Sequence, residues 1–168
     1  VNDAPITANP VSNQSIEEYT PFNFTLPENT FSDEDPADVL TYTADDLPAW
    51  LRFNPLTKRI TGLPGFPHRG THEINITAAD LEGANVTTQF TLTIQPKPNM
   101  NLLIGTDKKD KLKGNKSQNL LYGAAQDDDL HTNIGNDILD GGQDNDTLRA
   151  GKGENTLYGG TGNDILIG

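Results

Sequence analysis

Leucine recurs every nine residues through the C-terminal part of this 168-residue chain, without a slip. The series is Leu112, Leu121, Leu130, Leu139, Leu148, Leu157 and Leu166. A helix has a period of 3.6 residues and a strand a period of two, so neither element alone explains this spacing. A fixed longer period indicates stacked structural repeats, each of which buries its large side chain only against its neighbours.

An aspartate or asparagine stands two residues before each of these leucines. The set is Asp110, Asn119, Asp128, Asp137, Asp146, Asn155 and Asp164, and the nonapeptide frame runs from Gly105 to Ile167. Glycine and asparagine, frequent in the first five positions of a repeat, permit positive φ and let backbone carbonyls turn toward a cation. The following residues predict a short strand whose leucine fills the interior.

Two repeats, GGQDNDTL at 141–148 and GGTGNDIL at 159–166, follow the pattern G-G-x-G-x-D-x-U-x closely. Residues 105–168 therefore resemble the RTX (hemolysin-type) calcium-binding repeats, and the resemblance implies a parallel β-roll of seven nonapeptides. It also implies several Ca²⁺ ions, each lying between one repeat and the next but one. The expected metal ligands are Asp110, Asp128, Asp137, Asp146 and Asp164, with Asn119 and Asn155 as weaker ones.

Odd and even repeats differ in this ligand position. The odd repeats contribute Asp110, Asp128, Asp146 and Asp164, whereas the even repeats contribute Asn119, Asp137 and Asn155. A neutral amide oxygen is a weaker Ca²⁺ ligand than a carboxylate. We expect one edge of the roll, the odd edge, to bind calcium tightly and the other, the even edge, to bind it loosely or not at all.

Residues 1–95 show a different pattern, the period-two alternation of β-strands. Examples are Phe22/Phe24/Leu26 and Ile74/Ile76/Ala78, and turn signals such as Asp45-Asp46-Leu47-Pro48 separate the strands. About seven short strands of this kind predict an Ig/cadherin-like Greek-key β-sandwich. A proline-containing linker over residues 96–104 is expected to join it to the roll, which makes the whole chain all-β.

The motifs of the first half also come in a recognisable order. They are Asn2-Asp3-Ala4-Pro5, Phe31-Ser32-Asp33-Glu34-Asp35, Leu47-Pro48-Ala49-Trp50-Leu51, Ile60-Thr61-Gly62-Leu63-Pro64 and Ile76-Thr77-Ala78-Ala79-Asp80-Leu81-Glu82-Gly83. This order resembles the dystroglycan-type cadherin-like domain of large bacterial surface proteins. The resemblance implies calcium at two poles, one held by Asp3, Asp33 and Asp35 and the other by Glu17 or Glu18 with Asp80.

An alternative for these pole residues needs no metal. Asp33, Asp35 and Asp80 lie in predicted turns, where aspartate caps backbone amides by itself. Trp50 is expected to be a core residue, and His68, His72 and His131, which lack ligand spacing, are expected on the surface or in loops.

Composition narrows the function further. The net charge is -12, which disfavours nucleic acid as a partner, and the absence of cysteine excludes thiolate metal sites and disulfides. No apolar run has membrane-spanning length, so no transmembrane segment is expected in these residues, and no signal segment stands at Val1. The sequence starts in a linker-like segment and stops at the repeat glycine Gly168, so we expect a fragment of a longer protein. No nucleophile, histidine and acid form a recognisable arrangement, so no enzyme is predicted.

Two functions remain at this stage. The first is a non-catalytic adhesion or extender segment of a large secreted or cell-surface bacterial RTX adhesin. Its resemblance to type I secreted proteins implies that the repeats fold when they meet extracellular calcium. Its partners would be calcium, neighbouring domains of the same chain and a cell-surface or polysaccharide ligand. The second is an ancillary or carbohydrate-binding region of a secreted polysaccharide hydrolase.

Overall fold

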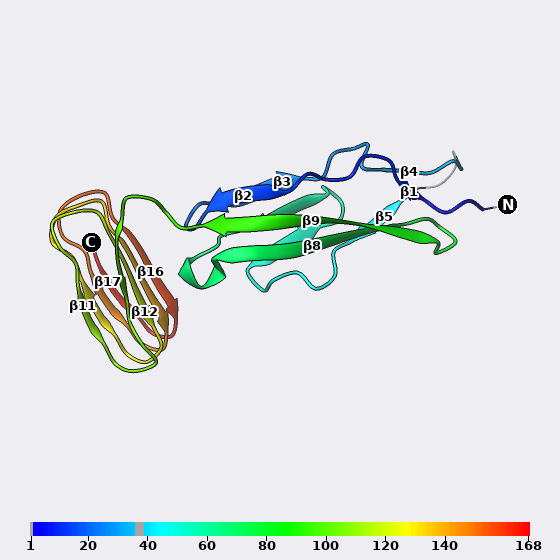
Figure 1. The fold of residues 1–168 in the computed structure, drawn as a ribbon. Coiled ribbons are helices and arrows are strands. Elements are labelled where there is room, and N and C mark those ends of the chain that lie inside the picture. Colours follow the sequence, from blue (N-terminus) through cyan, green and yellow to red (C-terminus); the bar gives the residue numbers. More distant parts are fainter. Residues whose placement is uncertain (1, 36–38) are drawn as a thin grey trace. The chain divides into compact units, whose positions relative to one another are not determined.

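The computed structural model describes residues 2–35 and 39–168, which form two compact units, Val1–Lys97 and Pro98–Gly168. Every regular element of the described residues is a strand, apart from one 3-10 turn at Phe66–His68. The predicted all-β class, an Ig/cadherin-like sandwich followed by a parallel roll, is confirmed. Figure 1 shows the strands of both units.

The first unit contains two main sheets. One has the order β2-β9-β8-β5 and the other the order β3-β7-β6, and a short antiparallel pair, β1 with β4, completes the unit. The bounds are β1 Ile6–Thr7, β2 Gln14–Glu17, β3 Phe22–Thr25, β4 Phe31–Ser32, β5 Thr41–Thr43, β6 Leu51–Asn54, β7 Arg59–Gly62, β8 Gly70–Ala79 and β9 Asn85–Gln95. Strands β8 and β9 form the long central hairpin, and β2 pairs with β9 in parallel.

The core of this unit comes from the alternating positions that the sequence marks. Ile74, Ile76 and Ala78 of β8 are fully buried. Phe90 and Leu92 of the neighbouring strand β9 lie beside them in the same cluster. Phe24 adds an aromatic contact to Phe90, with ring centroids 5.4 Å apart. Burying apolar side chains from both sheets is the main stabilising contribution to such a sandwich.

Trp50 packs against the edge of this core, and two histidines lie beside it. The His68 ring stacks on the indole at 5.1 Å, and the His72 ring meets it edge-on at 5.5 Å. His68 Nδ1 accepts a hydrogen bond from the backbone N–H of Gly65. Partial burial, followed by the nearby His72, lowers the pKa of His68. Both histidines therefore pack against Trp50. His68 lies in a turn, in agreement with the predicted surface or loop position, whereas His72 is a half-buried residue of strand β8.

The second unit is a roll of two parallel sheets. One sheet has the order β10-β12-β14-β16 and the other β11-β13-β15-β17. The bounds are β10 Asn101–Ile104, β11 Lys111–Lys113, β12 Asn119–Ala124, β13 Asp129–His131, β14 Ile138–Gln143, β15 Thr147–Arg149, β16 Thr156–Thr161 and β17 Ile165–Ile167. Successive strands alternate between the sheets, so partners lie 18 residues apart and loops collect at two edges (Figure 1).

The periodic leucines form the interior of the roll. Leu121, Leu130, Leu139 and Leu148 are completely buried, and Leu103, Leu112 and Leu157 pack against them. In-register pairs such as Leu121 with Leu139 and Leu130 with Leu148 stack the side chains along each sheet. The period of nine thus places one leucine on the inner face of every half-turn.

The roll begins earlier than the repeat frame suggests. Strand β10 lies inside the segment 96–104 that the sequence assigns to a linker, and it pairs with β12 from Asn101↔Asn119 to Ile104↔Tyr122. The sequence contains the signal for this extension. Leu103 stands nine residues before Leu112, and Asn101 stands two residues before Leu103.

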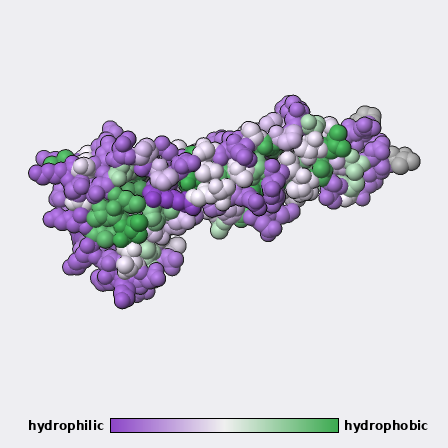
Figure 2. Space-filling view, viewed as in Figure 1, coloured by the Kyte–Doolittle hydropathy of each residue, from purple (hydrophilic) through white to green (hydrophobic). Residues whose placement is uncertain are grey.

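The surface of both units is mainly hydrophilic, in line with the acidic composition. Figure 2 shows one hydrophobic area of the roll over β17, which lies at the edge of its sheet, and Ile165, Leu166 and Ile167 there are about half exposed. None of the described segments forms a helix of the length and hydrophobicity that crossing a membrane requires.

Candidate metal centre

Four aspartates form a ladder along the odd edge of the roll. Asp110, Asp128, Asp146 and Asp164 come directly before β11, β13, β15 and β17. The backbone N–H of each of the first three donates to Oδ1 of the next, at 2.7, 2.8 and 2.9 Å. One oxygen of each acceptor carboxylate is therefore used to fix the spacing of the loops. The structure brings the four predicted odd-edge ligands together.

The second oxygen of two of these carboxylates has no partner. Oδ2 of Asp128 and Oδ2 of Asp146 are buried without a hydrogen bond, and the two residues are 3% and 1% exposed. A buried carboxylate oxygen without a donor is costly, because it has lost water and gained nothing in exchange. Such oxygens are what a calcium site would use.

Glycines border these unpaired oxygens. A Cβ atom on Gly123 would overlap both Asp128 Oδ2 and the carbonyl oxygen of Gly141. A Cβ atom on Gly141 would overlap Asp146 Oδ2 and the carbonyl oxygen of Gly159. Each glycine therefore lets the aspartate oxygen of its own loop and a carbonyl oxygen of the next odd loop approach its Cα atom closely. Two hard oxygens that converge in this way are donors of the kind that Ca²⁺ prefers.

The electrostatics of the ladder point the same way. Burial raises the pKa of Asp146 to about 6, with further raising contributions from Asp128 and Asp164, while the hydrogen bond from Asp128 lowers it. Burial also raises the pKa of Asp128. The ionised carboxylates are thus destabilised by lost hydration and by one another, and a divalent cation would offset both effects.

The ends of the ladder differ from its middle. Asp110 Oδ2 accepts hydrogen bonds from both the backbone N–H and the hydroxyl of Thr106, at 2.7 and 2.8 Å. Oδ2 of Asp110 is therefore already satisfied by the protein, unlike Oδ2 of Asp128 and Asp146. At the other end, a Cβ atom on Gly159 would overlap Asp164 Oδ2, so the close contact between glycine and aspartate also occurs in the last odd repeat.

The even edge has a corresponding ladder of mixed composition. The backbone N–H of Asn119 donates to Asp137 Oδ1 at 2.8 Å, and that of Asp137 donates to Asn155 Oδ1 at 3.0 Å. Asn101 extends the ladder, because its side-chain amide donates to Asn119 Oδ1 at 2.9 Å. Sequence reasoning missed Asn101, although its spacing from Leu103 matches the frame.

The three acids predicted at one pole of the sandwich lie together. The backbone N–H of Asp3 donates to Asp35 Oδ2 at 2.8 Å, and that of Asp35 donates to Asp33 Oδ1 at 2.9 Å. Asp33 Oδ2 is buried without a partner. The bond from Asp35 to Asp33 is that of an aspartate that caps a turn amide, which is the metal-free alternative for this cluster, whereas the bond from Asp3 joins two segments 32 residues apart.

Asp80 belongs to this same pole. Its Oδ2 accepts a hydrogen bond from the Asn2 side chain at 2.9 Å, and its Oδ1 accepts one from the Ala84 backbone at 2.8 Å. The Asn2 amide is the largest influence that lowers the pKa of Asp80, and partial burial opposes it. Asp80 begins the turn that joins β8 to β9, and its bond to Asn2 holds this turn next to the N-terminal residues.

The expected grouping of Glu17 or Glu18 with Asp80 is therefore corrected. Glu18 is fully buried, and its carboxylate forms a two-point ion pair with Arg69 at 2.5 and 2.7 Å. Its Oε1 also accepts the backbone N–H of Lys97, while Glu17 lies 3.7 Å from the Lys97 ammonium. Arg69 precedes β8 and Asp80 follows it, so the ten-residue strand separates the two groups. The cations Arg69 and Lys97 neutralise these glutamates.

Across residues 2–35 and 39–168, no three aspartate, glutamate or histidine side chains converge on one point that could hold a metal ion. A cation in the roll would consequently depend on backbone carbonyls as much as on carboxylates. The odd edge supplies that combination at Gly123 and Gly141.

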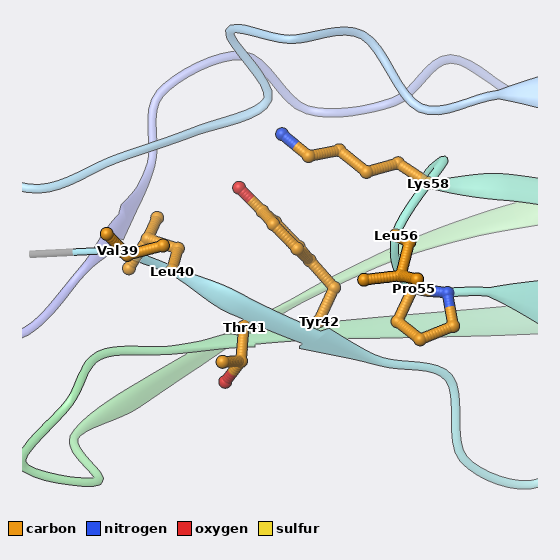
Figure 3. Close-up of a pocket in the computed structure, with 7 residues that line it drawn as sticks. All are labelled: Val39, Leu40, Thr41, Tyr42, Pro55, Leu56 and Lys58. Carbon is orange, nitrogen blue, oxygen red and sulfur yellow. The ribbon is translucent and has the colours of Figure 1, made fainter.

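The sandwich has a groove whose lining bears on carbohydrate binding. It has a volume of about 490 Å³ and is lined by Val39, Leu40, Thr41, Tyr42, Pro55, Leu56 and Lys58. Figure 3 shows the Lys58 side chain reaching across Tyr42, whose ring centroid lies 4.5 Å from the ammonium nitrogen. The lining is mostly apolar, and the Thr41 hydroxyl already donates to Ala79. Sugar recognition needs more hydrogen-bonding groups than this groove offers.

These features define an all-β protein with an Ig-like sandwich and a parallel roll that carries a ladder of aspartates along one edge. Residues 4–95 match the family model described as "Putative Ig domain", and the chain belongs to this family. Residues 104–139 and 140–168 match the model of the RTX calcium-binding nonapeptide repeat. RTX nonapeptide repeats bind calcium, so the family match and the geometry of the odd edge agree. A comparison with curated proteins gave no match.

Several solved structures are similar to about half of the chain, and this chain spans only part of the length of each. An alpha-galactosidase homologue from Bacteroides fragilis has 21% identity and a TM-score of 0.42, covering 56% of this chain and 18% of its own. An endo-fucoidan hydrolase of glycoside hydrolase family 107 has 19% identity and a TM-score of 0.49, covering 56% of this chain and 14% of its own. Domains EC1-2 of a human mucin-like protocadherin have 24% identity and a TM-score of 0.46, covering 58% and 56%.

Proposed function

We propose that this chain is a non-catalytic, calcium-binding segment of a secreted or cell-surface bacterial protein. In this proposal the sandwich is an extender domain of an adhesin, and the roll requires calcium on its odd edge to fold. The observation that carries it is the pair of buried, unpartnered oxygens, Oδ2 of Asp128 and Oδ2 of Asp146.

The roles of individual residues follow from their contacts. Asp128 and Asp146 would supply carboxylate oxygens, and Gly141 and Gly159 would supply carbonyl oxygens next to them. A bound Ca²⁺ would supply the positive charge that offsets repulsion between the stacked carboxylates. In a calcium-poor compartment the charged ladder would disfavour the folded roll, which suits export of an unfolded chain followed by folding outside the cell.

The test compares the full chain with Asp128→Asn/Asp146→Asn. Asparagine keeps an oxygen for the ladder hydrogen bond but removes the charge. The control is Asp127→Asn, because Asp127 is an exposed acid of the same loop whose Oδ1 accepts the Asn145 N–H. Isothermal titration with Ca²⁺ is expected to show binding by the wild type and the control and strongly reduced binding by the double variant. Equal binding by all three would refute the proposal.

The adhesion part of the proposal needs its own experiment. A non-catalytic extender predicts no hydrolysis of polysaccharides and no strong binding on a glycan array in the presence of calcium. Specific binding of a polysaccharide that Tyr42→Ala abolishes would favour the alternative, an ancillary region of a secreted hydrolase. The groove around Tyr42 is the surface on which that alternative would depend.

A further inference from the structure

We infer that the even edge of the roll is a metal-free edge, in which the side-chain amides of Asn119 and Asn155 take the place of a cation. The inference rests on the proposed function, because it divides the calcium sites of the roll between its two edges. The sequence predicts only weaker calcium ligands on the even edge. In this inference, amide groups stand there in the positions that cations would take.

The Asn119 amide nitrogen lies among three oxygens. It donates to the carbonyl oxygens of Asn115 and Ser117, at 3.2 and 2.6 Å, and to Asp137 Oδ1 at 2.8 Å. Asn115 and Ser117 are the second and fourth residues of their repeat. A carboxylate could not donate to these oxygens, whereas an amide NH₂ group can. The nitrogen therefore satisfies the oxygens that would otherwise face a cation.

Asn155 repeats the arrangement two repeats later. Its amide nitrogen donates to the carbonyl oxygens of Gly151 and Gly153, at 2.9 and 3.4 Å, again the second and fourth residues of the repeat. The same positions thus recur in both asparagine-containing loops of the even edge. On the odd edge, the side chain at the equivalent position carries an oxygen in place of this donor.

The first residue of each repeat gives independent support. On the odd edge it is always glycine, at positions 105, 123, 141 and 159, whereas on the even edge Thr132 and Ala150 replace it in two of three repeats. A Cβ atom on Gly114 would meet the Asn119 amide at 2.8 Å and the Thr132 methyl group at 2.9 Å. An amide and a methyl group therefore lie beside this glycine, whereas two oxygens lie beside Gly123 and Gly141 on the odd edge.

Asp137 is the one carboxylate in this ladder. Its Oδ2 and the Thr132 hydroxyl are both buried without a partner. Asp137 Oδ1 already accepts two hydrogen bonds from Asn119. Thr132 stands at the repeat position that Gly123 and Gly141 hold beside Asp128 and Asp146, so Asp137 has a side chain where those two aspartates have a glycine.

The first test substitutes Asn119→Asp and compares it with Asn136→Asp. The control has the same charge change on the same edge, but Asn136 is exposed, and an aspartate there can still accept the Glu154 N–H. At the lowest calcium concentration that folds the wild-type roll, we expect Asn119→Asp to lower the melting temperature of the roll by about 5 °C or more and Asn136→Asp to leave it nearly unchanged. Higher calcium concentrations should narrow the Asn119→Asp deficit, since the new carboxylate can bind calcium. Equal melting temperatures for the two variants at the lowest calcium concentration would overturn the inference.

A second test does not depend on folding of the Asn119 variant. We expect Asp137→Asn to bind as many calcium ions as the wild type in equilibrium dialysis, and Asp146→Asn to bind fewer. A loss of ions in Asp137→Asn equal to that in Asp146→Asn would overturn the metal-free edge. A wild type that is folded and binds no calcium would instead refute the proposed function, and the comparison of melting temperatures, made in that case without calcium, would still decide the role of the amides.

Discussion

The backbone N–H of Asp128 donates to Oδ1 of Asp146 at 2.8 Å, while Oδ2 of Asp146 is buried without any partner. The two residues stand 18 positions apart in the sequence and one step apart along the edge of the roll. One carboxylate oxygen thus holds two loops in register, and the other remains available for a cation. This division of tasks distinguishes the ladder from a row of aspartates that only cap backbone amides.

Asp146→Asn should weaken calcium binding without removing the ladder hydrogen bond. The loss of one charged ligand from the middle of the odd edge is expected to raise the calcium concentration at half-saturation by about tenfold or more, equivalent to about 1.4 kcal/mol. Far-UV circular dichroism during a calcium titration measures this midpoint. Asp127→Asn is the control, and a midpoint shared by both variants would contradict the assigned role.

Gly141→Ala should disturb the roll through space alone. The new methyl group would meet Asp146 Oδ2 and lie 2.6 Å from the Gly159 carbonyl oxygen. We expect a loss of about 1–3 kcal/mol in the free energy of unfolding and weaker calcium binding. Urea unfolding in calcium measures the first effect. Gly168→Ala, which meets nothing within 4 Å, should change neither quantity.

Leu139→Ala tests the stacked interior. Leu139 is fully buried between Leu121 and Leu157 of its sheet, so truncation leaves a cavity that the parallel strands cannot easily close. A loss of about 2–5 kcal/mol is expected in urea unfolding of the calcium-loaded chain. The matched control is Leu56→Ala in the sandwich, where the side chain is 92% exposed and its removal should cost little.

The sandwich should lose stability on acidification through His68. Because the pKa of His68 is lower in the folded state than its ordinary value of 6.5, the unfolded chain binds more protons below that value. The contribution of His68 is therefore complete above pH 6.5 and is lost as the pH falls through the folded-state pKa. Trp50 is the single tryptophan and lies beside His68, so its fluorescence reports thermal unfolding of this unit.

The histidine prediction is checked with two variants. His68→Gln, which does not titrate, should show a smaller drop in melting temperature between pH 7 and pH 5 than the wild type. His131→Gln changes an exposed residue of the roll and should keep the wild-type drop. The same pH dependence in all three chains would show that another group is responsible.

The architecture of the roll was predictable because its determinants are local and periodic. A leucine every nine residues with an acid or amide two positions earlier specifies one half-turn, and stacking repeats that geometry. The row of odd-edge aspartates followed from the same register. Asn101 and Leu103 also fit this register, but the proline-containing residues before them resemble a linker, and strand β10 was missed for that reason.

Other features depend on contacts that the sequence does not encode locally. The pairing of Glu18 with Arg69 and of Asp80 with Asn2 depends on which strand ends meet in the sandwich, so the order of acidic motifs misplaced Asp80. Ligand charge predicts that asparagine makes a weak calcium site, and this stays a prediction. The direction of the Asn119 amide, which donates to its own loop, became visible only with the backbone in place.

The central claim is that calcium on the odd edge completes the fold of the roll. The most direct measurement is far-UV circular dichroism of the full chain during a calcium titration, with a magnesium series and reversal by EDTA. We predict that the β-sheet signal grows with calcium and not with magnesium, and that the signal present without ions reports the sandwich. A spectrum that is fully formed in EDTA and unaffected by calcium would contradict the account.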